Sequence, residues 1–145
     1  MKQTIKTSNN DSRTYHSLTL NNGLKVLLTQ DLDSAKSAAS LTVNAGHFDD
    51  PEDRQGLAHF LEHMLFLGTD LYPEPGEFSK YTSQHGGSCN AWTGTEHSSY
   101  FFDIDGQYFN DALKQFSRFF INPLLSTTAT NKERNAIDAE FKLKL

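Results

Sequence analysis

An apolar stripe with helical spacing places the strongest constraint on how this chain can fold. Its members recur at intervals of three and four residues: Leu57, Phe60, Leu61, Met64 and Leu65. This periodicity predicts an amphipathic helix with one buried side. The helix is expected to begin between Pro51 and Gly56, after an acidic run that suits the positive end of a helix dipole. Gly68 suits its C-terminal cap.

Strands are expected on both sides of this helix. The segments that predict them are 15–20, 24–29, 37–44, 88–93 and 98–104. The first two are joined by Asn21-Asn22-Gly23, which is typical of a tight hairpin turn. Further helices are predicted over 77–84, 108–121 and 131–145. Elements in this order indicate the α+β class, with a mixed, largely antiparallel sheet and helices packed on one face.

Length and composition exclude several classes of protein. A chain of 145 residues has room for one domain, and we expect a polar, flexible N-terminus over 1–14 and the domain over 15–145. The net charge of −5 argues against a nucleic-acid partner. No apolar stretch approaches the roughly 20 residues that a membrane span needs. The single cysteine, Cys89, excludes an intrachain disulfide and a multi-cysteine zinc site.

The first ten residues hold two lysines with no apolar core behind them. A secretory signal peptide would show such a core. We therefore expect a cytoplasmic location, and a periplasmic one stays open.

The segment His59-Phe60-Leu61-Glu62-His63 carries the chemistry of the predicted helix. Residues four apart on a helix lie about 40° apart around its axis and roughly 6 Å along it, so both imidazoles can reach one metal ion. Zinc suits two neutral imidazoles and a carboxylate. Glu62 flanks this face, where a general base would reach a water. A histidine pair at this spacing also occurs by chance on surfaces and in cores, but H-x-x-E-H is the inverse of the H-E-x-x-H motif of zinc peptidases.

A catalytic zinc site needs a third protein ligand, and the C-terminal helix offers three acids. Glu133 and Glu140 are seven residues apart and share one helix face, whereas Asp138 points elsewhere. One of the two glutamates can bind the metal while the other supports a ligand histidine. Spacing alone leaves open which one does so, and glutamates on a terminal helix are most often solvated.

Three segments of the chain together resemble the pitrilysin/insulin-degrading enzyme family of inverzincin zinc peptidases. They are the zinc-binding segment 56–68, the segment 86–103 with Gly-Gly-Ser-Cys-Asn-Ala-Trp-Thr at its start, and Glu-Arg-Asn-Ala-Ile-Asp-Ala-Glu over 133–140. They occur in the family's order and with its spacing. The resemblance runs from about residue 15 to the last residue.

The resemblance implies a zinc-dependent metalloendopeptidase that hydrolyses peptides or small unfolded proteins. It identifies His59, His63 and Glu140 as zinc ligands and Glu62 as the catalytic base. Glu133 matches the family's supporting glutamate behind the site. In the implied mechanism, zinc activates a water whose proton passes to Glu62.

The resemblance also implies how a substrate binds. The segment 88–93 matches an edge strand to which the peptide adds as a further β-strand. Asn90 and Ala91 then meet the substrate backbone, and Trp92 and Phe66 line neighbouring apolar pockets. A tryptophan on a strand is as often part of the core, and that interpretation of Trp92 stays open.

The chain differs from the family pattern in its length. Family enzymes are several times longer, so it resembles an N-terminal part of the first domain, truncated at its C-terminal side. The expected partners are the remaining domains or a partner subunit of the same enzyme. Two other hypotheses are a non-catalytic relative that acts as an interaction subunit, and a scaffold that binds zinc without turnover.

Overall fold

The structure is a computed structural model that describes residues 5–143. The chain divides into two compact units, Met1–Ala35 and Lys36–Leu145. The expected flexible segment falls in the first unit, and its residues 1–4 lie outside the described residues. None of the helices in the described part is long and apolar enough to cross a membrane.

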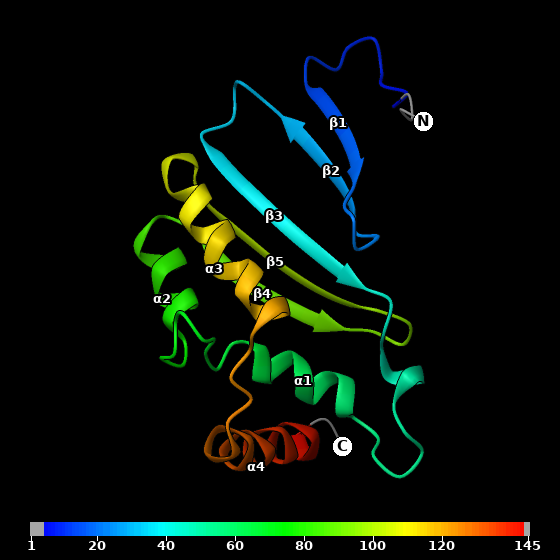
Figure 1. The fold of residues 1–145 in the computed structure, drawn as a ribbon, viewed down its shortest axis with the longest axis vertical. Helices are drawn as coiled ribbons and strands as arrows, with labels where there is room; N and C mark the ends of the chain where they lie inside the picture. The colour runs from blue at the N-terminus through cyan, green and yellow to red at the C-terminus, as the bar shows by residue number, and fades with distance from the viewer. Residues whose placement is uncertain (1–4, 144–145) are drawn as a thin grey trace. The chain divides into compact units, whose positions relative to one another are not determined.

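A β-hairpin forms the first unit (Figure 1). Strands β1 (Thr14–Thr19) and β2 (Lys25–Gln30) pair in antiparallel register. The predicted turn joins them, with Gly23 at a φ of 87°, a conformation that residues with a side chain rarely adopt. Just before β1, Asp11 accepts hydrogen bonds from Arg13 and Tyr15, which hold the pKa of its carboxyl far below the usual range.

A three-stranded antiparallel sheet forms the base of the second unit. It consists of β3 (Lys36–Val43), β4 (Ser88–Thr93) and β5 (Ser98–Asp105), with β5 in the centre. Among the described residues, β4 pairs with β5 alone and is an edge strand. The strands of this sheet lie within one residue of the predicted bounds. The α+β class is confirmed, and every pair of described strands is antiparallel.

The described part of the second unit also holds four α-helices, of which only α2 starts at the predicted residue and α3 starts one residue later than predicted. They are α1 (Leu57–Leu65), α2 (Glu77–Gln84), α3 (Phe109–Ile121) and α4 (Thr127–Leu143). Helix α1 begins after Gly56 and ends three residues before Gly68. Helix α4 begins four residues before the predicted Asn131, because the Ser126 hydroxyl accepts a hydrogen bond from the Ala129 N–H at 3.2 Å and caps it. The predicted residues 144–145 lie outside the described residues.

The core lies between one face of the sheet and helices α1, α2 and α3. Alternate residues of β5 supply its floor, and aromatic side chains from α2 and α3 cover them. The members are Leu65, Phe78, Tyr100, Phe102, Ile104, Ala112, Phe116 and Phe119. The rings of Phe78 and Phe102 meet edge to face with centroids 5.4 Å apart, a favoured aromatic geometry.

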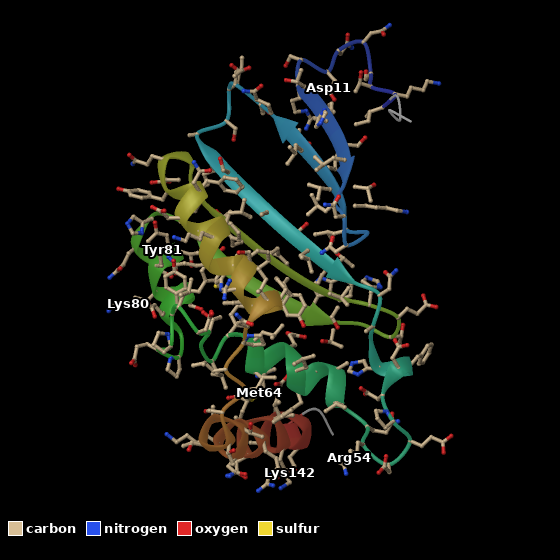
Figure 2. All side chains as sticks on the ribbon, in the orientation of Figure 1. Asp11, Arg54, Met64, Lys80, Tyr81 and Lys142 are labelled. Carbon is tan, nitrogen blue, oxygen red and sulfur yellow. The ribbon has the colours of Figure 1, made fainter. Side chains whose placement is uncertain are left out.

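The predicted stripe of α1 is buried only in its C-terminal turn. Met64 and Leu65 are buried, and Figure 2 shows Met64 on this helix. Leu57 and Leu61 are 45% and 43% exposed, so the expectation of one continuous buried stripe was wrong. The N-terminal half of α1 instead borders a cavity, and Leu57 is one of the residues that line it. On α3, Leu113 is exposed and Phe119 is buried.

Removing a core ring should destabilise the protein far more than removing an apolar side chain at the surface of the same helix. We expect Phe116→Ala to lower the free energy of unfolding by about 3–5 kcal/mol, because it leaves a cavity among aromatic rings. Leu113→Ala is the matched control and should change it by less than about 1 kcal/mol. Urea denaturation of both variants measures this difference. Equal losses would contradict the assignment of the core.

Candidate metal centre

The N-terminus of helix α1 is held by an acidic side chain from the loop before it. The Asp50 carboxylate accepts hydrogen bonds from the N–H groups of Gly56 at 2.7 Å and Ala58 at 2.8 Å. Helix N-termini leave such N–H groups without partners inside the helix, and a carboxylate also stabilises the positive end of the dipole. The side chain of Asp50 is only 2% exposed. One residue of the acidic run, Asp50, therefore caps this helix, although the helix begins seven positions further along the chain.

Helix α1 brings two imidazoles together on one side. The Nε2 atoms of His59 and His63 are 3.1 Å apart. Their rings meet at 90° with centroids separated by 4.7 Å. This is the arrangement expected of two residues one helical turn apart, and both nitrogens face the same space.

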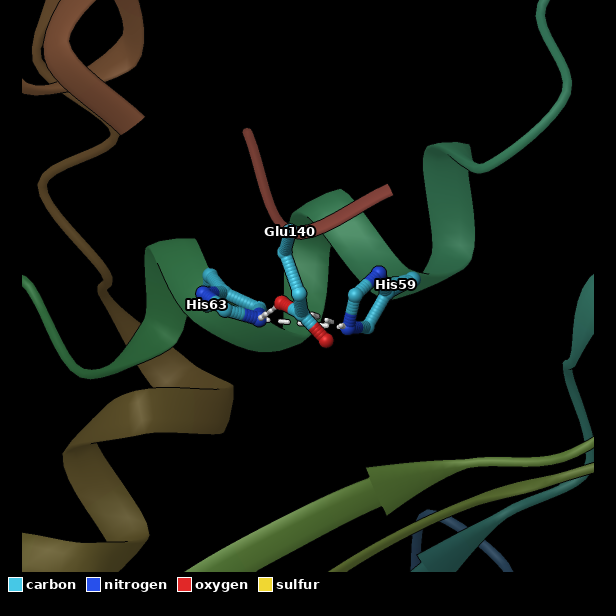
Figure 3. Close-up of side chains that lie close together, drawn as sticks. All are labelled: His59, His63 and Glu140. Atoms are coloured by element: carbon cyan, nitrogen blue, oxygen red, sulfur yellow. Dashed lines mark hydrogen bonds and ion pairs between the residues drawn. The ribbon is translucent and has the colours of Figure 1, made fainter. Parts of the chain in front are cut away.

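Helix α4 lies beside α1 and directs a carboxylate at the same point (Figures 1 and 3). The Oε2 atom of Glu140 lies 3.6 Å from the Nε2 of His63 and 3.9 Å from the Nε2 of His59. The potential ligand atoms of these three residues all lie within 4.8 Å of one another. Residues far apart in the sequence therefore form one cluster.

The cluster has the dimensions of a tetrahedral zinc site. With metal–ligand bonds of about 2.0 Å, the ligand atoms of a tetrahedron are about 3.3 Å apart. The observed separations of 3.1, 3.6 and 3.9 Å bracket this value. Two imidazoles and one carboxylate are also a donor set that zinc accepts, with a fourth position left for a water. The residues present thus fit the metal.

A second glutamate of α4 contacts the opposite side of one imidazole. Glu133 Oε1 lies 2.7 Å from Nδ1 of His63, which places the proton of a neutral ring on Nδ1 and the lone pair on Nε2. Asp138 is exposed and accepts a hydrogen bond from Lys142 at 2.6 Å; it lines the same cavity but is not one of the three converging groups. Spacing alone left the choice between Glu133 and Glu140 open. The geometry puts Glu140 against both Nε2 atoms and Glu133 behind the ring.

The remaining acid of the motif, Glu62, is nearly enclosed. It is 8% exposed, and its Oε2 accepts a hydrogen bond from the hydroxyl of Thr93. Burial raises the pKa of the neighbouring Tyr100 to about 12, and the negative charge of Glu62 adds to this shift. The carboxylate of Glu62 therefore lies in the same cavity as the cluster of His59, His63 and Glu140 but is not a member of that cluster.

A cavity of about 1150 Å³ opens in front of these residues. Its walls come from the loop before α1, from α1 and α4, and from the edge strand β4. His59, Glu62 and His63 face it across from Ala91 and Trp92. Residues of the edge strand β4 and the candidate metal ligands therefore line the same cavity.

The predicted substrate-contacting residues are not all brought to this cavity. Trp92 lines it, is 45% exposed and sets its ring edge against His97. Asn90 is exposed on the same strand but is absent from the cavity wall. Phe66 is also absent from the wall, and its ring packs on Phe119 with centroids 5.0 Å apart.

Sequence reasoning missed two residues that the site uses. Thr93 ends the Gly-Gly-Ser-Cys-Asn-Ala-Trp-Thr motif, but nothing in that motif predicted that its hydroxyl contacts Glu62. Asp50 was part of the acidic run taken as a helix start, but its individual role needed the loop geometry. His47 also lines the cavity, with its Nδ1 3.8 Å from Oδ2 of Asp50.

Comparisons with known proteins agree on one family. The model of the insulinase family (peptidase family M16) matches residues 25–143. Insulin-degrading enzyme-like 2 of Arabidopsis thaliana is 50% identical over 135 residues, 93% of this chain and 14% of that protein. The insulin-degrading enzyme of Homo sapiens is 46% identical over 138 residues, 95% of this chain and 14% of that protein. The crystal structure of pitrilysin matches with a TM-score of 0.93 at 35% identity, over 99% of this chain and 15% of that one.

These matches cover nearly all of the chain but only a small part of each relative. The chain spans about 14% of the length of the curated relatives it matches. The family model nevertheless covers both the H-x-x-E-H segment and the helix that carries Glu140. The chain belongs to the insulinase family, peptidase family M16, which is a family of zinc metallopeptidases.

Proposed function

We propose that this chain is the zinc-binding catalytic segment of a metalloendopeptidase that hydrolyses peptide bonds in peptides or small unfolded proteins. The observation that carries the proposal is the convergence of His59, His63 and Glu140 beside the nearly enclosed carboxylate of Glu62. Membership of a peptidase family supports the same reaction class.

The metal would be held by the two Nε2 atoms and by a carboxylate oxygen of Glu140. Zinc in such a site supplies a Lewis acid that activates water and polarises the peptide carbonyl. His59 and His63 come from adjacent turns of one helix, so their separation is set by the helix itself. Glu140 comes from α4, which makes the site dependent on how α4 packs against α1.

Glu62 would act as the general base. Its carboxylate lines the cavity and is held by the Thr93 hydroxyl, so it is oriented before a substrate arrives. It takes a proton from the attacking water and later passes it to the leaving amine nitrogen. Glu133 would keep the His63 ring in the tautomer that presents Nε2, through its contact with Nδ1.

The peptide substrate would add to the free edge of β4. Backbone hydrogen bonds along an exposed strand edge hold an extended peptide with little regard to its sequence. Asn90 and Ala91 are proposed to meet the substrate backbone, and the exposed face of Trp92 to contact an apolar side chain. The pocket role predicted for Phe66 stays a prediction.

The remaining domains, or a partner subunit, would complete the site. The relatives are about seven times longer than the matched segment. Groups that enclose the substrate are therefore proposed to come from parts of the enzyme beyond this chain. Activity tests accordingly use the complete gene product.

Replacing the proposed base should separate metal binding from catalysis. We expect Glu62→Gln to keep one zinc per chain and to lower kcat at least about 100-fold, because the amide cannot accept the proton. Zinc content by mass spectrometry and cleavage of a fluorogenic peptide measure the two effects. Glu74→Gln, an exposed loop variant, is the control and should resemble the wild type.

Two results of this experiment would reject the proposal. Unchanged turnover in a fully zinc-loaded Glu62→Gln variant would remove Glu62 from the mechanism. A wild-type protein that binds zinc and cleaves no peptide would instead favour the structural or interaction subunit.

Removing the charge behind His63 should weaken the metal site without removing a ligand. We expect Glu133→Gln to lower zinc affinity about 10- to 100-fold, the usual cost of losing such a supporting carboxylate. Asp138→Asn, on the same helix but exposed, is the matched control and should bind zinc as the wild type does. Competition with a zinc-binding dye measures both affinities. Equal affinities in all three proteins would contradict the role given to Glu133.

A further inference from the structure

The hydroxyl of Thr93 is the one hydrogen-bond donor to Glu62 among the described residues. Thr93 Oγ1 donates to Glu62 Oε2 across a separation of 31 positions in the chain. An ionised carboxylate can only accept, so the direction of this bond is fixed. The bond fixes the position of Oε2, while Oε1 accepts no hydrogen bond from the residues that the structure describes.

The hydrogen bond matters because of where Glu62 lies. The residue is 8% exposed, so water can do little to hold the carboxylate in one orientation. Hydrogen bonds to a charged group in such surroundings are stronger than those between neutral groups. A general base must also keep its oxygen within about 2.6–3.2 Å of the proton it removes. One donor of fixed direction supplies that constraint.

Three interactions fix the position of Thr93. It ends strand β4, where its backbone pairs with Ser98 of β5. The Ser98 hydroxyl donates to the carbonyl of Ala45 at 2.9 Å and lies 3.4 Å from Thr93 Oγ1. Directly after Thr93, the Gly94 N–H donates to the carbonyl of His97 at 2.8 Å and closes the hairpin. The hydroxyl thus sits on rigid backbone, which is what accurate positioning requires.

We propose that Thr93 is a positioning residue that orients the general base Glu62 through its hydroxyl. This inference rests on the proposed function. It also gives β4 a second role. The strand that is proposed to bind the substrate backbone ends at Thr93, whose hydroxyl holds Glu62. The hydroxyl acts on the chemical step, so its loss lowers kcat and leaves KM and zinc affinity unchanged.

The test removes the hydroxyl while keeping the shape of the side chain. In the complete gene product, Thr93→Val is expected to lower kcat about 10- to 100-fold, the scale of a small misplacement of a catalytic group. Thr93→Ser keeps the hydroxyl and should return kcat to within about 3-fold of the wild type. Thr42→Val, on β3, is the matched control, because it removes a hydroxyl whose one side-chain partner among the described residues is Ser99.

Further measurements separate positioning from a structural effect. Zinc affinity and melting temperature of Thr93→Val should match those of Thr42→Val. In a Glu62→Gln background, Thr93→Val should cause no additional loss of the residual rate, because no base is left to orient. If the valine variant does not fold, Thr93→Ser and Thr93→Ala provide the same comparison, since they differ by one hydroxyl.

Three outcomes would overturn the inference. They are a wild-type kcat in Thr93→Val, an equal loss in the serine variant, and a loss that appears in KM alone. Each is distinguishable from failure of the proposed function. That failure shows as full activity of Glu62→Gln, whereas an inactive Glu62→Gln beside a fully active Thr93→Val rejects only the role of Thr93.

Discussion

The site depends on one packing interaction, the contact between helices α1 and α4. Helix α1 alone sets the two imidazoles 3.1 Å apart, but two neutral nitrogens do not make a catalytic zinc site. The carboxylate of Glu140 reaches both only because α4 lies alongside. The same helix carries Glu133, which contacts Nδ1 of His63. The packing of α4 against α1 therefore positions both the proposed third ligand, Glu140, and the carboxylate that supports His63. A displacement of α4 would remove both at once.

The sheet holds the other side of this arrangement. The loop between β4 and β5 accepts hydrogen bonds from the N–H groups of His47 and Phe48, which lie in the connection between β3 and α1. Gly46 permits this approach, because a Cβ atom there would lie 2.4 Å from the Gly94 oxygen. Asp50 then caps α1 from the same loop. Loop, hairpin and helix are thus connected through backbone hydrogen bonds, which places the proposed substrate strand and the proposed base in one rigid frame.

Local patterns in the sequence predicted much of this fold, and the errors have physical causes. The bounds of α2 and β4 followed from turn residues and periodicity, and the H-x-x-E-H spacing placed both imidazoles on one face. The exposure of Leu57 was missed because a helical stripe is buried only where another element covers it, and here a cavity takes that place. The choice between Glu133 and Glu140, and the contact of Thr93 with Glu62, depend on packing between distant segments. Spacing along the chain carries no information about such contacts.

The most direct test of the proposed metal centre is to locate the metal. Crystals of the complete gene product grown with zinc would be measured on both sides of the zinc absorption edge. We predict one anomalous-difference peak about 2.0–2.2 Å from Nε2 of His59, Nε2 of His63 and a carboxylate oxygen of Glu140. A peak elsewhere, or one at the histidines with Glu140 turned away, would contradict the account.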